Sequence, residues 1–179
     1  VKWMKYLYDN NMGGCLADDM GLGKTLQTIG MLNLVYPAEK KTTLLVMPRS
    51  LLFNWQSEIA RFSPNLSVYT YYGNTRDLNE AMKRQVVLTT YAIVRNDIET
   101  FRKQTFHYVI LDESQNIKNV STQSTQAVFM LNAEHRLALS GTPIENNLGE
   151  LYSLFRFLNP AMFGSLDDFN ARYANPIQK

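Results

Sequence analysis

Lys24 and Thr25 follow two glycines, Gly21 and Gly23, in a stretch that has the pattern of a short strand, a turn and a helix start. Glycine lets the backbone turn its N–H groups inward, and those groups, with the positive end of the next helix, form a concave site for phosphate. The Lys24 ammonium can reach the β- and γ-phosphates of a nucleotide, and the Thr25 hydroxyl can ligate Mg²⁺. Asp18 stands where the usual pattern G-x-x-x-x-G-K-[ST] has its first glycine. This stretch alone therefore leaves a glycine turn beside a surface lysine as an alternative.

Two adjacent carboxylates, Asp112 and Glu113, end the most apolar stretch of the chain, Tyr108–Leu111. Asp112 could hold Mg²⁺ opposite Thr25, directly or through water, and Glu113 could orient and deprotonate an attacking water. The alternative is an acidic pair that meets the positive end of a helix. Beside a phosphate loop the pair favours ATP hydrolysis, in which a protein contributes positioning and charge neutralisation more than covalent chemistry.

These groups need a scaffold that brings them together, and the hydrophobic pattern predicts one. Apolar runs without polar alternation, typical of strands covered on both faces, alternate with apolar residues at helical spacing. Strands are predicted within 13–17 and at 43–47, 66–72, 86–90, 108–111 and 136–139, and helices at 1–11, 26–36, 75–84 and around the stripes Leu52/Trp55/Ile59/Phe62, Val94/Ile98/Phe101, Val128/Leu131 and Leu151/Leu154/Phe155/Leu158. The alternation predicts an α/β fold with a doubly wound, mainly parallel sheet and helices on both faces.

Ligands in such sheets bind beyond the carboxyl ends of the strands. The phosphate loop, Asp112–Glu113 and the segment 140–142 each follow a predicted strand. We therefore expect these three polar clusters to converge at one edge of the sheet.

Composition limits the remaining possibilities. The 179 residues, 45% of them hydrophobic, are enough for one core and predict a single domain. A net charge of +2 is too small to indicate nucleic-acid binding by itself. The single Cys15 excludes an internal disulfide partner, and no apolar run approaches the roughly 20 residues of a membrane span. Val1 begins inside an apparent helix, which suggests part of a longer protein, and His107 and His135 are interpreted as strand-end residues without a role.

Five segments occur in an order known from one motor family. They are LADDMGLGKT at 16–25, LVMPRSLL with NW and EI at 45–59, VLTTY at 87–91, LDESQNIKN at 111–119, and LSGTPIEN with ELYSL at 139–154. They resemble motifs I, Ia, Ib, II and III of the first RecA-like lobe of Swi/Snf ATPases, double-stranded DNA translocases of helicase superfamily two. Ser114 stands where alanine or glycine is usual, Ser140 where threonine is common, and motifs IV to VI of the second lobe are missing.

The resemblance implies the fold of a RecA-like P-loop NTPase lobe over residues 1–160, starting just after the adenine-recognition motif, and a connector at 161–179 toward a second RecA-like lobe of the same chain. It implies ATP and Mg²⁺ as ligands. The implied roles are nucleotide binding for Asp19, Met20, Gly21, Leu22, Gly23, Lys24 and Thr25, catalysis for Glu113, Lys24 and Gln115, metal binding for Thr25 and Asp112, and coupling to the lobe interface for Ser140, Gly141 and Thr142.

The same resemblance implies contacts to the backbone of double-stranded DNA. The residues concerned are Arg49, Ser50, Thr89, Thr90, Tyr91, Lys118 and Asn119. Donors placed just after strands suit phosphates, and phosphate contacts carry no sequence information, as a motor that walks along any duplex requires. Each of these residues taken singly could instead be a capping or turn residue.

The expected function is ATP-driven movement along double-stranded DNA without strand separation, and remodelling of nucleoprotein complexes. An ATP-dependent RNA helicase lobe and a nucleotide-binding scaffold without turnover are the alternatives. The segment Ser140–Pro143 with Asn54–Trp55 argues against the RNA helicase, and intact Lys24, Asp112 and Glu113 argue against the scaffold. The 179 residues alone are expected to be nearly inactive, and such a motor is expected in a eukaryotic nucleus or in bacterial cytoplasm with the nucleoid.

Overall fold

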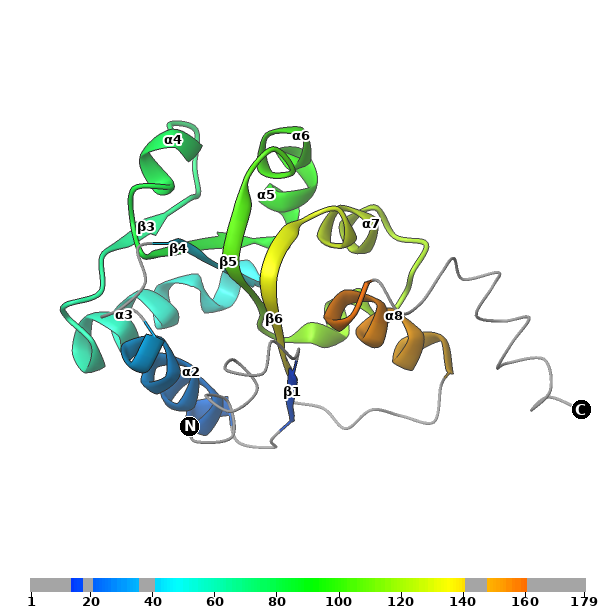
Figure 1. Ribbon diagram of the computed structural model, residues 1–179, viewed down its shortest axis with the longest axis horizontal. Coiled ribbons are helices and arrows are strands. Elements are labelled where there is room, and N and C mark those ends of the chain that lie inside the picture. The colour runs from blue at the N-terminus through cyan, green and yellow to red at the C-terminus, as the bar shows by residue number, and fades with distance from the viewer. Residues whose placement is uncertain (1–13, 18–20, 36–40, 141–147, 161–179) are drawn as a thin grey trace, which may run out of the picture.

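The structure is a computed structural model that describes residues 14–17, 21–35, 41–140 and 148–160. Six strands form one sheet in the order β1-β6-β5-β2-β4-β3 (Figure 1), and every neighbouring pair is parallel. The strands are β1 (Gly14–Ala17), β2 (Thr43–Met47), β3 (Val68–Thr70), β4 (Val86–Thr90), β5 (Thr105–Leu111) and β6 (Asn132–Ser140). The helices are α2 (Gly21–Val35), α3 (Leu52–Phe62), α4 (Leu78–Ala81), α5 (Tyr91–Asn96), α6 (Ile98–Phe101), α7 (Gln123–Phe129) and α8 (Leu148–Leu158), with the 3₁₀ turns η1 (Arg49–Leu51) and η2 (Ser114–Ile117).

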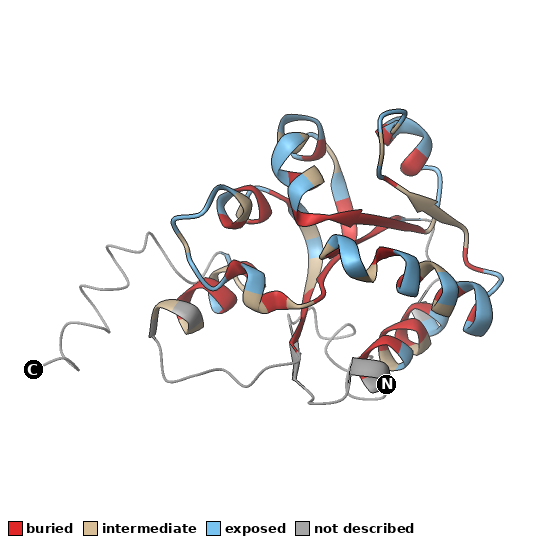
Figure 2. Cartoon of the chain, turned by 180° about the vertical axis from the view of Figure 1, so that it is seen from behind, coloured by how far each residue is buried: buried red, intermediate tan, exposed pale blue. Residues whose placement is uncertain are grey.

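Both faces of the sheet are covered. Strands β2 and β4 are buried along their whole length, which is why their sequences lack polar alternation. Leu45 and Ile110 lie in a cluster with side chains of α2 and α3, whereas Val46 and Val109 lie in a second cluster with α5, α7 and α8. Figure 2 shows the buried residues along the strands and on parts of the helices, with exposed residues on their outer sides. The predicted parallel α/β fold is confirmed.

Local sequence signals explain several of the helix boundaries. The side chains of Asp77, Thr90 and Thr122 cap α4, α5 and α7 by accepting backbone N–H groups of the first turn. In α3 the predicted stripe is buried at Leu52, Trp55 and Ile59. Its last member, Phe62, is 44% exposed, because it is the final residue of the helix and lies beyond the packed turns.

Several elements differ from the prediction. Strand β3 is shorter than the predicted 66–72 because it lies at the edge of the sheet, and α4 is a single turn rather than the helix 75–84. One predicted helix is split into α5 and α6 at Asp97, whose carboxylate receives side chains from the β3–α4 segment. Strands β5 and β6 both start earlier than predicted. His107 and His135 therefore lie within strands and not at their ends. The first residues of these strands are partly polar, so the apolar pattern did not include them.

The strand register fixes where the polar clusters lie. Ala17 pairs with Ser140, and Leu111 pairs with Ala138, so β1, β6 and β5 end at the same edge of the sheet. The predicted convergence of the strand ends is present for the described residues. The predicted helix 1–11 and the connector 161–179 lie outside the described residues. No helix in the described part of the chain is long and apolar enough to cross a membrane.

Candidate nucleotide site at the carboxyl edge of the sheet

The side chain of Lys24 is buried near the start of α2. Helix α2 starts at Gly21, so Lys24 and Thr25 lie in its first turns, where backbone N–H groups and the helix dipole favour an anion. Lys24 is 2% exposed, and its Nζ has no hydrogen-bond partner among the described residues. Burying an unpartnered charge is costly. The amine is therefore suited to an anionic ligand such as a phosphate.

The rest of the predicted phosphate loop is only partly described. Gly21, Leu22 and Gly23 form the first turn of α2. Thr25, two residues further along the helix, is buried. Asp19 and Met20 lie outside the described residues. The donor set that remains, one ammonium, one hydroxyl and a helix N-terminus, is the chemistry that binds a triphosphate.

Asp112 is held by three donors, namely side chains from α3 and α5 and the backbone N–H of the next residue. The Trp55 indole N–H of α3 donates to Oδ2 at 2.8 Å, and the backbone N–H of Glu113 donates to Oδ1 at 2.8 Å. The Tyr91 hydroxyl of α5 donates to the Asp112 carbonyl oxygen at 2.6 Å. Both the orientation of the carboxylate and the position of its backbone are therefore fixed before any ligand binds.

Burial shifts the acidity of the Asp112 carboxyl. Burial raises the pKa of its carboxyl above the ordinary 3.8, although the hydrogen bonds from Trp55 and the Glu113 backbone and the charge of Lys24 act the other way. Burial thus disfavours the ionised form, and a divalent ion beside the oxygens would favour it again. The charge of Lys24, in the other direction, favours the ionised carboxylate.

Glu113 has a strained backbone and a fixed side chain. Its φ of 50° puts it in the left-handed region, and no other non-glycine residue of the described ranges has a positive φ. Such strain in a non-glycine residue is common at functional sites. The Gln115 amide donates to the Glu113 carboxylate, and the Ser140 hydroxyl donates to Gln115 Oε1 at 3.3 Å. A hydrogen-bonded chain thus runs from the end of β6 to Glu113, whereas Gly141 and Thr142 lie outside the described residues.

The residues predicted to contact DNA fall into two groups. Arg49, Ser50, Lys118 and Asn119 are exposed and follow β2 or β5, at the same edge as Asp112. The Arg49 guanidinium lies 5.7 Å from the centre of the Tyr72 ring. These four residues are placed where an external partner can reach them.

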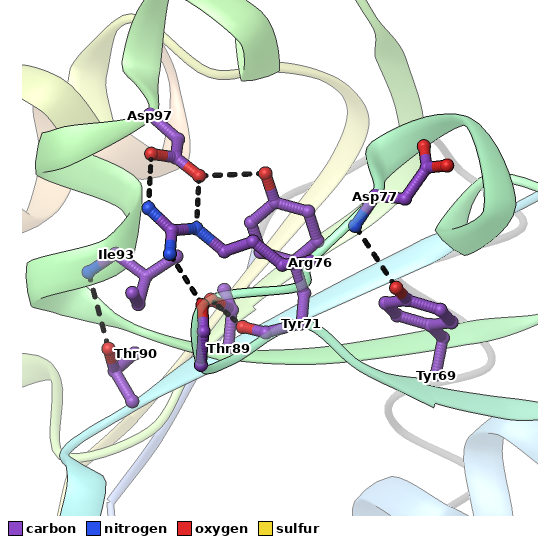
Figure 3. Close-up of polar contacts among 9 residues, drawn as sticks. Tyr69, Tyr71, Arg76, Asp77, Thr89, Thr90, Ile93 and Asp97 are labelled. Carbon is purple, nitrogen blue, oxygen red and sulfur yellow. Dashed lines mark hydrogen bonds and ion pairs between the residues drawn. The ribbon is translucent and has the colours of Figure 1, made fainter.

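Thr89, Thr90 and Tyr91 are buried, and their side chains have internal partners. Thr89 Oγ1 donates to the Tyr71 carbonyl at 2.9 Å, and Thr90 Oγ1 accepts the Ile93 N–H at 3.2 Å (Figure 3). With Tyr91 bound to Asp112, all three side chains turn into the protein. Their contact with DNA stays a prediction, and it would have to use backbone groups.

Sequence reasoning missed two features around the site. Trp55 was assigned only to an apolar stripe and a motif, although a buried indole N–H needs an acceptor and so signals a polar neighbour. The second is an ion pair in Figure 3, in which Arg76 donates to both oxygens of Asp97 at 2.6 and 2.9 Å and the Tyr71 hydroxyl donates at 2.7 Å. Burial and Asp97 raise the pKa of Tyr71 to about 12, and no sequence pattern marks this cluster in advance.

With this geometry established, the comparisons with known proteins identify the family. The family model for the SNF2-related domain matches residues 1–179. The chain belongs to the SNF2-related family. Among curated relatives, this SNF2-related chain is 42% identical to the Helicase ssl-1 of Caenorhabditis elegans, over 99% of the chain and 8% of that protein. It is also 42% identical to the putative ATP-dependent helicase/translocase YwqA of Bacillus subtilis, over 100% of the chain and 20% of that protein.

Solved structures agree with the family assignment. The SWI2/SNF2 ATPase core of Sulfolobus solfataricus in complex with dsDNA superimposes with a TM-score of 0.89 at 39% identity, covering 99% of this chain and 38% of that one. The Sulfolobus solfataricus SWI2/SNF2 ATPase core domain superimposes with a TM-score of 0.85 at 38% identity, covering 98% of this chain and 36% of that one. The SNF2-related chain thus spans a fifth or less of the two curated relatives named above and less than two fifths of each solved core.

Proposed function

We propose that the protein containing this SNF2-related chain uses ATP and Mg²⁺ to move along double-stranded DNA without separating its strands, and thereby remodels nucleoprotein complexes. The observation that carries the proposal is the buried Lys24 amine, which shares one sheet edge with the oriented Asp112–Glu113 pair. The similar ATPase core described in complex with dsDNA supports the choice of partner.

Each side chain at the edge has a definite part in the proposed reaction. Lys24 binds the phosphates, and Thr25 and Asp112 supply the oxygen ligands that Mg²⁺ prefers. When bound, Mg²⁺ neutralises charge on the phosphate oxygens. Glu113 orients water and accepts its proton, and Gln115 fixes the Glu113 carboxylate by the hydrogen bond described above.

DNA contacts and the nucleotide site are linked through Asp112. The exposed Arg49 and Ser50 precede α3, which carries the Trp55 indole to the carboxylate. Lys118 and Asn119 follow Asp112 through η2. We assign phosphate contacts to these four residues, and we assign Tyr91 the role of a support for Asp112 rather than a DNA contact.

The organisation of the longer protein is part of the proposal. Residues 1–160 form the first lobe, 161–179 lead to a second RecA-like lobe, and that lobe completes both the nucleotide site and the DNA track. Ser140, with Gly141 and Thr142, transmits the nucleotide state toward that lobe through Gln115. The complete protein would act where its DNA lies, in a nucleus or in bacterial cytoplasm.

The test measures ATP turnover by the protein expressed from its complete open reading frame. Equal nucleotide concentrations of duplex DNA, single-stranded DNA and RNA are compared, and duplex DNA is expected to stimulate most. Glu113→Gln is expected to abolish the stimulated turnover, whereas Glu99→Gln, which removes an exposed ion-paired carboxylate, leaves it intact. Preferential stimulation by RNA would favour an RNA helicase. Turnover that Glu113→Gln leaves unchanged would not come from this site and would leave the scaffold standing, and absence of turnover would favour the scaffold.

A second comparison locates the DNA track. Lys118 and Lys103 are both exposed, but Lys118 follows β5 at the carboxyl edge and Lys103 precedes it at the amino edge. Lys118→Ala is expected to lower duplex affinity and to reduce the salt dependence by about one phosphate contact. Lys103→Ala is the matched control, and an equal loss in both variants would contradict the assigned track.

A further inference from the structure

A cluster of metal-binding side chains lies at the end of the sheet away from the nucleotide edge. His107 is near the start of β5, and Glu134 and His135 are near the start of β6. One ring nitrogen of each histidine and one carboxylate oxygen of Glu134 all lie within 4.8 Å of one another. Among the described residues this is the one group of three or more histidine, cysteine, aspartate and glutamate side chains that converges in this way.

The donor atoms are close to the spacing of a metal site. His107 Nδ1 lies 3.1 Å from Glu134 Oε2, and the two imidazole rings are 5.1 Å apart at 86° to each other. Donors bound to zinc at about 2.0–2.1 Å in a tetrahedron are separated by about 3.3 Å. The His107–Glu134 pair already has this spacing. The His135 ring stacks on Tyr108 at 5.1 Å, and its donor atom lies within 4.8 Å of the other two.

The strand register brings the three residues to the same level of the sheet. Phe106 pairs with Ala133, and Tyr108 pairs with His135 in the parallel ladder of β5 and β6. His107 and Glu134 therefore lie at equivalent positions of neighbouring strands. Their side chains are in direct contact, and a donor atom of His135 lies within 4.8 Å of both.

Lys41 now occupies the carboxylate that a metal would use. Its ammonium donates to both Glu134 oxygens, at 2.8 and 2.9 Å. The two side chains are 49% and 38% exposed, and an exposed ion pair of this kind contributes at most about 1 kcal/mol. The flexible lysine can therefore move into solvent when a divalent cation replaces its charge, and Glu134 provides the route of entry from the surface.

We propose that His107, Glu134 and His135 form a binding site for one divalent transition-metal ion, with zinc as the best match. Two imidazoles and one carboxylate are a common zinc ligand set that leaves a fourth position for water. Mg²⁺ prefers oxygen ligands and is not expected to bind here. The ion would connect β5 and β6 at the amino edge, independently of the proposed function at the opposite edge.

The chain has two histidines, so its imidazole NMR signals report on the site without ambiguity. Zinc titrated into metal-free, ¹⁵N-labelled chain is expected to bind at one equivalent and to shift both rings, whereas Mg²⁺ shifts neither. Cys15→Ala is titrated in parallel, because a thiolate is a strong zinc ligand. The same response in this variant is expected, and loss of binding in it would overturn the site.

Three variants test the ligands by competition with a chromophoric chelator. Glu134→Gln and His135→Gln are expected to weaken zinc binding at least tenfold. Glu80→Gln is the matched control, because Glu80 is likewise an exposed carboxylate paired with a lysine, and it should leave the affinity unchanged. Equal affinity in all variants, or ring signals that zinc does not move, would overturn the proposal.

A fourth variant acts in the opposite direction and does not remove a ligand. Lys41→Met eliminates the competing cation while leaving both histidines and Glu134 in place, so zinc affinity is expected to increase several-fold. A structural role for these residues alone would not produce that gain. Unchanged or weaker binding in Lys41→Met would contradict the proposed arrangement, even if a ligand variant failed to fold.

Discussion

The hydrogen bond from Trp55 to Asp112 provides a sharp test of how the acidic edge is organised. Trp55→Phe keeps an aromatic ring in α3 but removes the indole N–H that donates to Oδ2 at 2.8 Å. Both residues are buried, at 1% and 6% exposure, so water cannot readily replace the lost donor. The substitution therefore leaves a buried carboxylate with one hydrogen bond fewer.

The expected magnitude depends on the charge of Asp112. A hydrogen bond to an ionised group contributes about 1.5–3 kcal/mol and one to a neutral group about 0.5–1.5 kcal/mol. The smaller ring adds roughly 1 kcal/mol for lost apolar burial at any pH. At pH 7 we expect the free energy of unfolding to fall by about 2.5–4 kcal/mol. Burial raises the pKa of the Asp112 carboxyl above 3.8, and the hydrogen bond from Trp55 lowers it. The hydrogen bond therefore stabilises the fold more when Asp112 is ionised, and this additional stabilisation is lost as the pH falls and the carboxyl becomes protonated.

The loss in free energy of unfolding is measured by urea unfolding of the parent and of Trp55→Phe between pH 8 and pH 4.5. Circular dichroism follows the unfolding, because its signal does not depend on the tryptophan. The penalty is expected to shrink by about 1 kcal/mol toward the acidic end. Tyr91→Phe is the matched control, because it removes a donor to the Asp112 carbonyl, which does not titrate. Its penalty, about 0.5–1.5 kcal/mol, should not change with pH. A Trp55→Phe penalty that is constant or grows in acid would refute the reasoning.

Three further predictions concern neighbouring contacts. Glu113→Asn is expected to raise the free energy of unfolding by about 0.5–1 kcal/mol in urea, because asparagine tolerates positive φ, while ATP turnover by the complete protein is lost. Asp97→Asn is expected to cost about 1–2 kcal/mol at pH 7. Arg76 lowers the pKa of Asp97 below 3.8, so this stabilisation is complete above that value and disappears as urea unfolding is repeated at lower pH. Ser140→Ala is expected to reduce DNA-stimulated turnover several-fold with unchanged ATP affinity, because Gln115 loses a donor; measured turnover equal to the parent would contradict this.

The sequence was most informative where burial is uniform. The boundaries of β2 and β4 agree with the prediction, because every residue of these strands is buried and the apolar runs start and stop with them. Lys24 and Asp112 could also be placed at one edge, because parallel strands leave their carboxyl ends together. Topology alone thus gave the position of the site.

Contacts between distant segments could not be predicted in the same way. The left-handed backbone at position 113 is occupied by glutamate, whereas glycine or asparagine would have indicated it in the sequence. The ion pair of Asp97 with Arg76 joins residues 21 positions apart. Thr89 and Thr90 were predicted to donate to DNA, because the sequence does not show whether a threonine hydroxyl faces solvent or bonds to a group inside the protein. The missing information is the direction of each side chain, which tertiary packing decides.

The place of β1 in the sheet has a consequence for the proposed nucleotide site. This four-residue strand lies at one end of the strand order and pairs with β6, whereas the central strands have neighbours on both sides. In the described sheet, β1 can therefore detach with the loss of a single ladder, while the remaining five strands stay together. On the proposed function, a triphosphate bound at the start of α2 would also hold the end of β1, so that nucleotide binding would order this strand locally without rearranging the core.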